Sequence, residues 1–159
     1  MEELYREGAV RAIGVCNFTP EHLERLQEES TELPAVNQVE LHPYLSQEKL
    51  RRYCASKGIT VEAWGPLMRG KVVGLEVLER IGARHGKSAA QVALRWDLQH
   101  GLVTIPKSST PSRIRENAGV FDFELSDEEM RSIDMLNRNE AVVGPGPDNF
   151  EEFFDSIGL

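Results

Sequence analysis

Lys107, Ser108 and Arg113 form a group of residues that could hold an anion. Lys107 and Ser108 end a short apolar run, and Arg113 lies shortly after Thr110 and Pro111, a pair typical of a helix start. We therefore expect Lys107 at the carboxyl end of a strand and Arg113 in the first turn of the next helix. Unpartnered backbone N–H groups, a positive dipole end and two cations suit a phosphate group. On spacing alone, two solvated charges at an ordinary strand-to-helix turn explain the pattern equally well.

Other polar or aromatic side chains lie within or after further apolar runs. Cys16 and Asn17 follow one run, Gln38 lies within a second, and Trp64 ends a third. The amides of Asn17 and Gln38 offer paired donors and acceptors, which a carboxamide ligand would match. For either amide alone, a buried side chain that caps backbone groups is the favoured interpretation, and Trp64 could be an ordinary core residue.

The elements that must position these residues alternate between strand and helix. We expect strands at residues 10–15, 36–41, 59–64 and 102–105, the last of them short and buried. Helices are expected to begin at Thr19–Pro20, at Ser46, and at the capping boxes Ser88/Gln91 and Ser126/Glu129. This order predicts an α/β fold with parallel strands and right-handed crossovers. Ligands of such folds bind beyond the carboxyl ends of the strands, where the polar residues above gather.

Several further segments have a clear local pattern. Residues 65–74 are typical of a loop, residues 75–85 and 111–120 of helices, and Gly58 of a helix end. Ala89, Val92, Ala93 and Trp96 have the spacing of a core-facing helical stripe. A loop at residues 144–147 and a tail with Phe150, Phe153 and Phe154 end the chain.

Composition excludes several classes of function. The 159 residues allow one domain, taken as 1–159, and the net charge of −8 without a basic run argues against nucleic acid as a partner. No segment has the length and apolar character of a membrane span or a signal peptide, so a cytoplasmic protein is expected. Cys16 and Cys54 show no disulfide or metal-site spacing. His42 and His85 have no sequence neighbour that suggests a triad or a metal, and the acidic run 127–129 is expected to be solvated.

Three stretches together resemble the aldo-keto reductases. Residues 105–108 (IPKS), followed by Arg113 and then Glu116 and Asn117, resemble the C-terminal signature of that family. Residues 11–18 (RAIGVCNF) resemble its central signature, and residues 34–44 (PAVNQVELHPY) the segment that follows. The resemblance implies parallel βα units that form the second half of a TIM-type (β/α)8 barrel, about four strands plus extra helices.

The resemblance also implies a nicotinamide cofactor, NADP(H). Cys16, Asn17 and Gln38 would surround the carboxamide, with a thiol at position 16 where the family usually has the better hydrogen-bonding serine. Trp64 would stack on the nicotinamide in place of the usual tyrosine. Its neighbours Gly65 and Leu67 would also contact the cofactor.

The signature around residue 107 implies the adenosine end of the same cofactor. Lys107, Ser108 and Arg113 would hold the 2′-phosphate, which favours NADPH over NADH. Glu116 and Asn117 would contact the adenine.

By resemblance, the chemistry would be carbonyl reduction by hydride from the nicotinamide. The family's proton donor is a tyrosine supported by lysine, aspartate and histidine from the first half of the barrel, and no stretch here matches those motifs. We therefore expect no catalytic residue and no metal in this chain, and a small carbonyl substrate only when a first half completes it. The alternative is a non-catalytic half-barrel that binds nucleotide weakly or serves as an assembly unit. Such a half-barrel could form a homodimer through its exposed edges.

Overall fold

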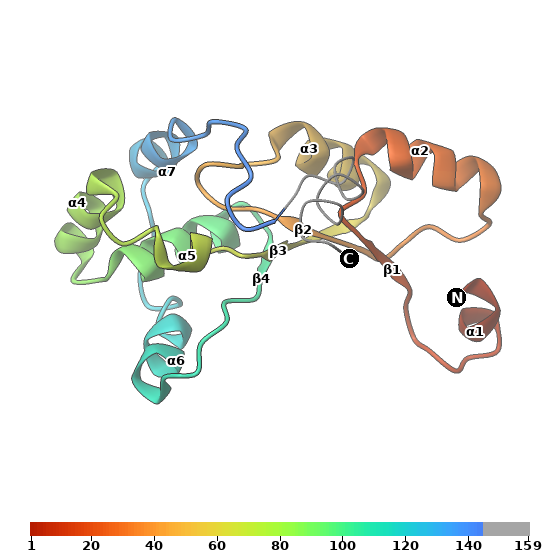
Figure 1. Ribbon diagram of the computed structural model, residues 1–159, viewed down its shortest axis with the longest axis horizontal. Helices are drawn as coiled ribbons and strands as arrows, with labels where there is room; N and C mark the ends of the chain where they lie inside the picture. Colours follow the sequence, from red (N-terminus) through yellow and green to blue (C-terminus); the bar gives the residue numbers. More distant parts are fainter. Residues whose placement is uncertain (145–159) are drawn as a thin grey trace, which may run out of the picture. The chain divides into compact units, whose positions relative to one another are not determined.

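The computed structural model describes residues 1–144 and shows the alternation of strands and helices expected from the sequence (Figure 1). Four parallel strands form one sheet in the order β1-β2-β3-β4: β1 (Gly14–Cys16), β2 (Val36–Glu40), β3 (Thr60–Trp64) and β4 (Val103–Thr104). The predicted α/β class with four parallel strands is therefore confirmed. The loop expected at 144–147, except Gly144, and the Phe150–Phe154 tail lie outside the described residues.

The chain forms two compact units, which we describe separately. The described part of unit 1 comprises Met1–Val39, Gln47–Glu62 and Gly144. It contains α1 (Glu2–Arg6), β1, α2 (Pro20–Glu29), α3 (Glu48–Lys57) and most of β2 and β3. Its buried side chains include Leu23 of α2 and Leu50 and Cys54 of α3, and the two helices pack against each other.

Unit 2 comprises Glu40–Ser46 and Ala63–Val143. It contains the 3-10 turn η1 (Met68–Gly70), α4 (Glu76–His85), α5 (Ala89–Gln99), β4, α6 (Pro111–Ala118) and α7 (Asp127–Asp134). Helix α5 is central, since it packs against α4, α6 and β4. Its predicted stripe of Ala89, Val92, Ala93 and Trp96 is buried, as the helical spacing indicated.

Local signals placed most helix starts correctly. Thr19, Ser88 and Ser126 each cap a helix, and each accepts a hydrogen bond from a backbone N–H in the first turn. Gly58, with φ +70°, ends α3 as expected.

The prediction that Ser46 caps the helix of residues 48–57 is wrong. Gln47 is the N-cap residue of α3 and has a left-handed backbone with φ +50°. Ser46 is buried, and its N–H donates to Asn137 Oδ1 at 3.0 Å. A contact to a residue so distant in sequence decides this helix start, and no local pattern could indicate it.

The predicted bounds of the first strand were too long toward the N-terminus. Residues 10–15 were expected to be extended, but Val10 N–H donates to Leu4 O at 3.3 Å and so completes the end of α1. Strand β1 begins only at Gly14, which pairs with Val36 of β2. A Cβ on Gly14 would lie 2.8 Å from Val36 O, so glycine permits this close approach of the two backbones.

The last strand is not buried as predicted. Only Leu102 is buried, whereas Val103 and Ile105 are 42% and 43% exposed. Strand β4 stands at the end of the strand order, with β3 as its one neighbour among the described strands. An edge strand leaves part of its side-chain surface uncovered, which an apolar run alone does not reveal.

Glu129 is also not solvated, in contrast to the prediction for its acidic run. It is 7% exposed, lies 3.0 Å from His85 Nε2 and forms an ion pair of 3.0 Å with Arg84. Burial by itself would raise the pKa of Glu129, but hydrogen bonds from Ser126 and His85 outweigh it and hold that pKa below the usual 4.5.

Candidate functional site

The residues predicted to hold the adenosine and stacking parts of the cofactor share one cleft in unit 2. The cleft has a volume of about 800 Å³, within the usual range for small-molecule sites. Its lining includes every predicted residue of that unit: Trp64, Gly65, Leu67, Lys107, Ser108, Arg113, Glu116 and Asn117. Strand β3 supplies Trp64 at its carboxyl end, and α6 supplies Arg113, Glu116 and Asn117.

The cations of this cleft are positioned by the start of α6. Lys107 and Arg113 are exposed, and within residues 1–144 neither of them forms an ion pair. Thr110 is the N-cap residue, but its side chain makes no capping hydrogen bond, and Pro111 opens the helix. Ser108 Oγ instead accepts from Thr110 N–H at 3.2 Å, which orders the turn between the two cations. The arrangement leaves positive charge at the positive end of a helix dipole, and this is suited to a phosphate group.

The loop after Trp64 has unusual backbone geometry. Met68 and Arg69 both have positive φ, of +53° and +54°, which costs free energy for residues other than glycine. Met68 is fully buried, so its side chain holds the loop against the core of unit 2. Strained backbone of this kind is common where a loop borders a ligand site.

Arg69 and Val143 are among the lining residues of this cleft that the sequence did not single out. Arg69 and Val143 come from the strained loop and from the segment after α7, and Arg69 Nη2 donates to Val143 O at 2.7 Å. No sequence motif marks either residue, because a contact between positions 69 and 143 depends on the path of the intervening chain.

Cys16 and Asn17 line a different cleft, of about 650 Å³, in unit 1. The other lining residues belong to the β1–α2 turn and to α2: Phe18, His22, Arg25, Leu26 and Glu29. Asn17 has φ +58°, a left-handed conformation that asparagine tolerates better than most residues. Cys16 is exposed, but neighbouring atoms partly desolvate its sulfur and raise the pKa of the thiol, so the sulfur is protonated and a weak hydrogen-bonding group at neutral pH.

Gln38 lies next to Asn17 through the backbone, since Asn17 N–H donates to Gln38 O at 2.8 Å. The Gln38 side-chain nitrogen donates to Glu62 of β3. A carboxylate can only accept here, so this contact turns the Gln38 oxygen away from Glu62. A shared site of Cys16, Asn17 and Gln38 with Trp64 stays a prediction.

Two histidines outside both clefts have carboxylate neighbours. His42 and His85 each lie beside a carboxylate, Glu40 and Glu129, although no sequence neighbour had suggested a partner in a triad or metal site. Within residues 1–144, no cluster of three or more His, Cys, Asp or Glu side chains could hold a metal ion. None of the helices in this part of the chain has the length and apolar character needed to cross a bilayer.

Comparison with known proteins gives a consistent result. Residues 1–138 match the model of the aldo/keto reductase family. The chain is 57% identical to glyoxal reductase of Bacillus subtilis over 148 residues, which is 93% of this chain and 53% of that protein. It is 44% identical to methylglyoxal reductase DkgA of Escherichia coli over 152 residues, 94% of this chain and 55% of that protein. The chain thus spans about half the length of the curated relatives it matches.

Solved structures show the same partial match. An aldo-keto reductase from a deep-sea metagenome library superposes with a TM-score of 0.88 at 41% identity, covering 92% of this chain and 55% of that one. A Bombyx mori aldo-keto reductase in complex with NADP gives a TM-score of 0.84 at 35% identity, with 91% and 50% covered. The fold described above is therefore about half of the fold of these enzymes.

Proposed function

Because the chain belongs to the aldo/keto reductase family, we propose that it binds NADPH and forms the cofactor-holding half of a carbonyl reductase. The observation that carries this proposal is the cleft of unit 2, where Lys107 and Arg113 flank the start of α6 while Trp64 lines the same cavity. NADP and NADPH are bound in structures of relatives. When bound, the nicotinamide would supply the hydride for reduction of a carbonyl group.

The residues of this chain have binding and orienting roles in the proposal. The guanidinium of Arg113 and the ammonium of Lys107 would neutralise the 2′-phosphate, and Ser108 would order the turn between them. The indole of Trp64 would offer a flat face to the nicotinamide ring. Asn17 and Gln38 would bind its carboxamide, with the Gln38 oxygen as the acceptor because its nitrogen is directed to Glu62.

Titration with NADPH and with NADH, followed by cofactor fluorescence, tests the assignment. We expect the chain to bind NADPH more tightly than NADH, because only NADPH carries the phosphate that the two cations would hold. Equal affinity for both cofactors, or no binding of either, would contradict the proposal.

The substrate is proposed to be a small reactive carbonyl compound, as the names of the glyoxal and methylglyoxal reductases suggest. We propose that turnover needs a first barrel half, which would supply the proton donor. Assaying NADPH oxidation with methylglyoxal, for the chain alone and mixed with a first half from the Bacillus subtilis relative, separates the two cases. Activity of the chain alone would show that a proton donor exists among these residues.

The second candidate is a non-catalytic half-barrel that assembles with itself. Exposure of Val103 and Ile105 around the edge strand β4 favours it, since apolar edges tend to become interfaces. Sedimentation equilibrium at micromolar concentration would show a homodimer in this case. We also propose a cytoplasmic location, which is consistent with two free cysteines.

A further inference from the structure

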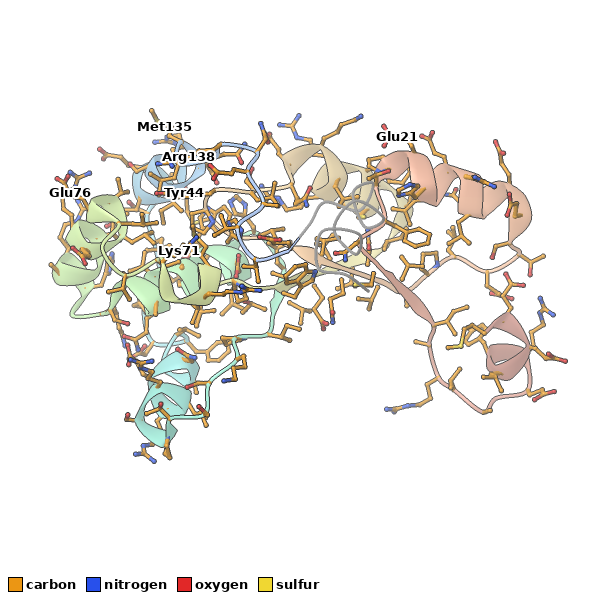
Figure 2. All side chains as sticks on the ribbon, in the orientation of Figure 1. Glu21, Tyr44, Lys71, Glu76, Met135 and Arg138 are labelled. Atoms are coloured by element: carbon orange, nitrogen blue, oxygen red, sulfur yellow. The ribbon has the colours of Figure 1, made fainter. Side chains whose placement is uncertain are left out.

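The segment after α7, residues 137–143, is fastened to residues 40–46 of unit 2; we call it the strap. Its first half is held by the turn after β2. Arg138 N–H and Glu140 N–H both donate to Tyr44 O, at 3.0 and 3.2 Å. The Arg138 guanidinium also lies 3.9 Å from the centre of the Tyr44 ring, and Figure 2 shows the two side chains together. The beginning of the strap is therefore anchored by backbone and side-chain contacts.

The end of the strap is held by a buried carboxylate. Glu40 Oε1 accepts from Val142 N–H at 2.6 Å and from Val143 N–H at 2.7 Å, and it lies 2.9 Å from His42 Nε2. Glu40 is 5% exposed and His42 is fully buried. A buried carboxylate is costly unless several donors satisfy it, so Glu40 and the strap depend on each other for this arrangement.

A cation binds the other backbone polar group of the same residue. Val143 N–H is bonded to Glu40, and Val143 O accepts from Arg69 Nη2 at 2.7 Å. Both backbone polar groups of Val143 thus face an opposite charge, one buried and one exposed. Charge-assisted hydrogen bonds of this kind are the stronger ones in proteins.

Val143 thereby lies close to Gly65, the residue that follows the predicted stacking residue Trp64. A Cβ placed on Gly65 would lie 3.1 Å from Val143 Cγ2, and Gly65 directly follows Trp64. Val143, Gly65, Trp64 and Arg69 all line the cleft of unit 2. Val143, which Glu40 and Arg69 hold in place, therefore forms part of the wall around the predicted nicotinamide position.

We propose that Glu40 and Arg69 are positioning residues that clamp Val143 as a fixed wall of this cleft and so slow the release of bound dinucleotide. The clamp itself is independent of the proposed function, whereas its effect on the dinucleotide rests on that function. A wall that is ordered before binding does not have to be ordered on binding, so the cofactor is held more tightly and leaves more slowly.

The clamp can be tested without cofactor by hydrogen exchange at the amides of Val142 and Val143. Glu40→Ala should speed exchange there roughly tenfold to hundredfold, as expected when hydrogen bonds to a charged group are lost. Glu40→Gln keeps an oxygen acceptor and should restore most of the protection. Glu140→Ala is the matched control, because it removes a strap carboxylate but leaves the clamp intact. Unchanged exchange at both amides in Glu40→Ala would overturn the clamp.

Arg69→Ala gives a second test that does not disturb the core, since Arg69 is exposed. The chain has two tryptophans, and Trp96 is fully buried, so acrylamide quenching of fluorescence reports mainly on Trp64. We expect quenching to increase in Arg69→Ala and to return toward the original value in Arg69→Lys. If Glu40→Ala fails to fold, the quenching measured for Arg69→Ala becomes the deciding test. Unchanged quenching in Arg69→Ala would overturn the clamp.

Stopped-flow release of NADPH tests the functional part. Arg69→Ala should release NADPH about threefold to tenfold faster, the scale of one hydrogen bond, with an unchanged melting temperature. Faster exchange or quenching with an unchanged release rate would overturn the positioning role. If the original chain binds no NADPH, the proposed function fails, and the clamp is then judged by exchange and quenching alone.

Discussion

The two clefts of this protein differ in how far their charged and polar side chains are already bonded to other groups of the protein. In the unit 1 cleft, Arg25 pairs with Glu29 at 3.3 Å, and His22 Nδ1 accepts the Thr19 N–H at 3.2 Å as part of a helix cap. In the unit 2 cleft, Lys107 and Arg113 form no ion pair within residues 1–144. Cations that the fold leaves without a counter-charge are available to an anion, so the second cleft is the better candidate for phosphate binding.

The two clefts also differ in the number of chain segments that build them. Phe18 and His22 meet edge to face at 5.7 Å beside the unit 1 cleft, on a single helix and the turn before it. The unit 2 cleft is built from the end of β3, a strained loop, α6 and the strap, and α5 packs against α6 and β4. A site assembled from so many segments depends on the core beneath it.

The largest effect is expected on the free energy of unfolding, from truncating a tryptophan in that core. Trp96 is fully buried, and its Nε1–H donates to Asp134 Oδ1 at 2.9 Å. Trp96→Ala should lower the free energy of unfolding by about 3–5 kcal/mol, because it leaves a cavity under α5. Urea unfolding measures the loss, and Phe121→Ala is the control, since Phe121 is 74% exposed. A loss below about 1 kcal/mol for Trp96→Ala would mean that α5 does not support unit 2 in this way.

The next largest effect is expected on cofactor affinity, and it distinguishes the unit 2 cleft from the unit 1 cleft. Arg113→Ala should weaken NADPH binding by about 1–3 kcal/mol and barely change NADH binding, because a charged hydrogen bond to the 2′-phosphate is lost. Arg25→Ala, which removes an arginine from the other cleft, should leave both affinities unchanged. Fluorescence titration of both variants with both cofactors provides the comparison. Equal weakening of NADPH and NADH by Arg113→Ala would contradict the phosphate assignment.

A smaller effect is expected on the pH dependence of stability, for which we compare one glutamate from each unit. Glu129 in unit 2 is buried, and hydrogen bonds from Ser126 and His85 lower its pKa below 4.5 despite its burial. Its folded-state pKa lies below the unfolded value, so the stability it contributes is present above pH 4.5 and lost as the pH falls below that value. Glu129→Gln should therefore flatten the acid limb of the stability curve.

Glu21 in unit 1 is the comparison for that experiment. It lies exposed at the start of α2 (Figure 2), where backbone hydrogen bonding in the first turn and Lys49 lower its pKa to about 2. Because exposed charges are screened, added salt should reduce the effect of Glu21→Gln more than it reduces the effect of Glu129→Gln. Urea unfolding between pH 3 and 7 at about 0.05 and 0.5 M NaCl makes this test. Equal salt sensitivity of the two variants would be the contrary result.

The smallest effect should come from Cys16. If the side chain at this position contacts the carboxamide, Cys16→Ser replaces a weak thiol by a hydroxyl and should tighten NADPH and NADH equally, by up to about 1 kcal/mol. The same fluorescence titrations measure it. Tightening of only one cofactor, or of neither, would remove Cys16 from the carboxamide site.

The sequence alone determined the local parts of this molecule. Helix starts at Thr19, Ser88 and Ser126 were predicted because a cap involves only a hydroxyl and the first turn that follows it. Trp64 and Lys107 were predicted at the carboxyl ends of strands, which share one edge in a parallel sheet, and Arg113 in the helix turn that follows; the family resemblance then implied their cofactor roles.

Only the tertiary structure decided the features that join distant positions. Ser46 lost its predicted capping role to a contact with Asn137, and Val103 is exposed because β4 has one neighbour in the described sheet. Glu40 was not singled out from the sequence, and its partners at Val142 and Val143 lie about a hundred residues further along the chain. Periodicity and capping describe neighbours along the chain, whereas a buried carboxylate is satisfied by whichever donors the fold brings to it.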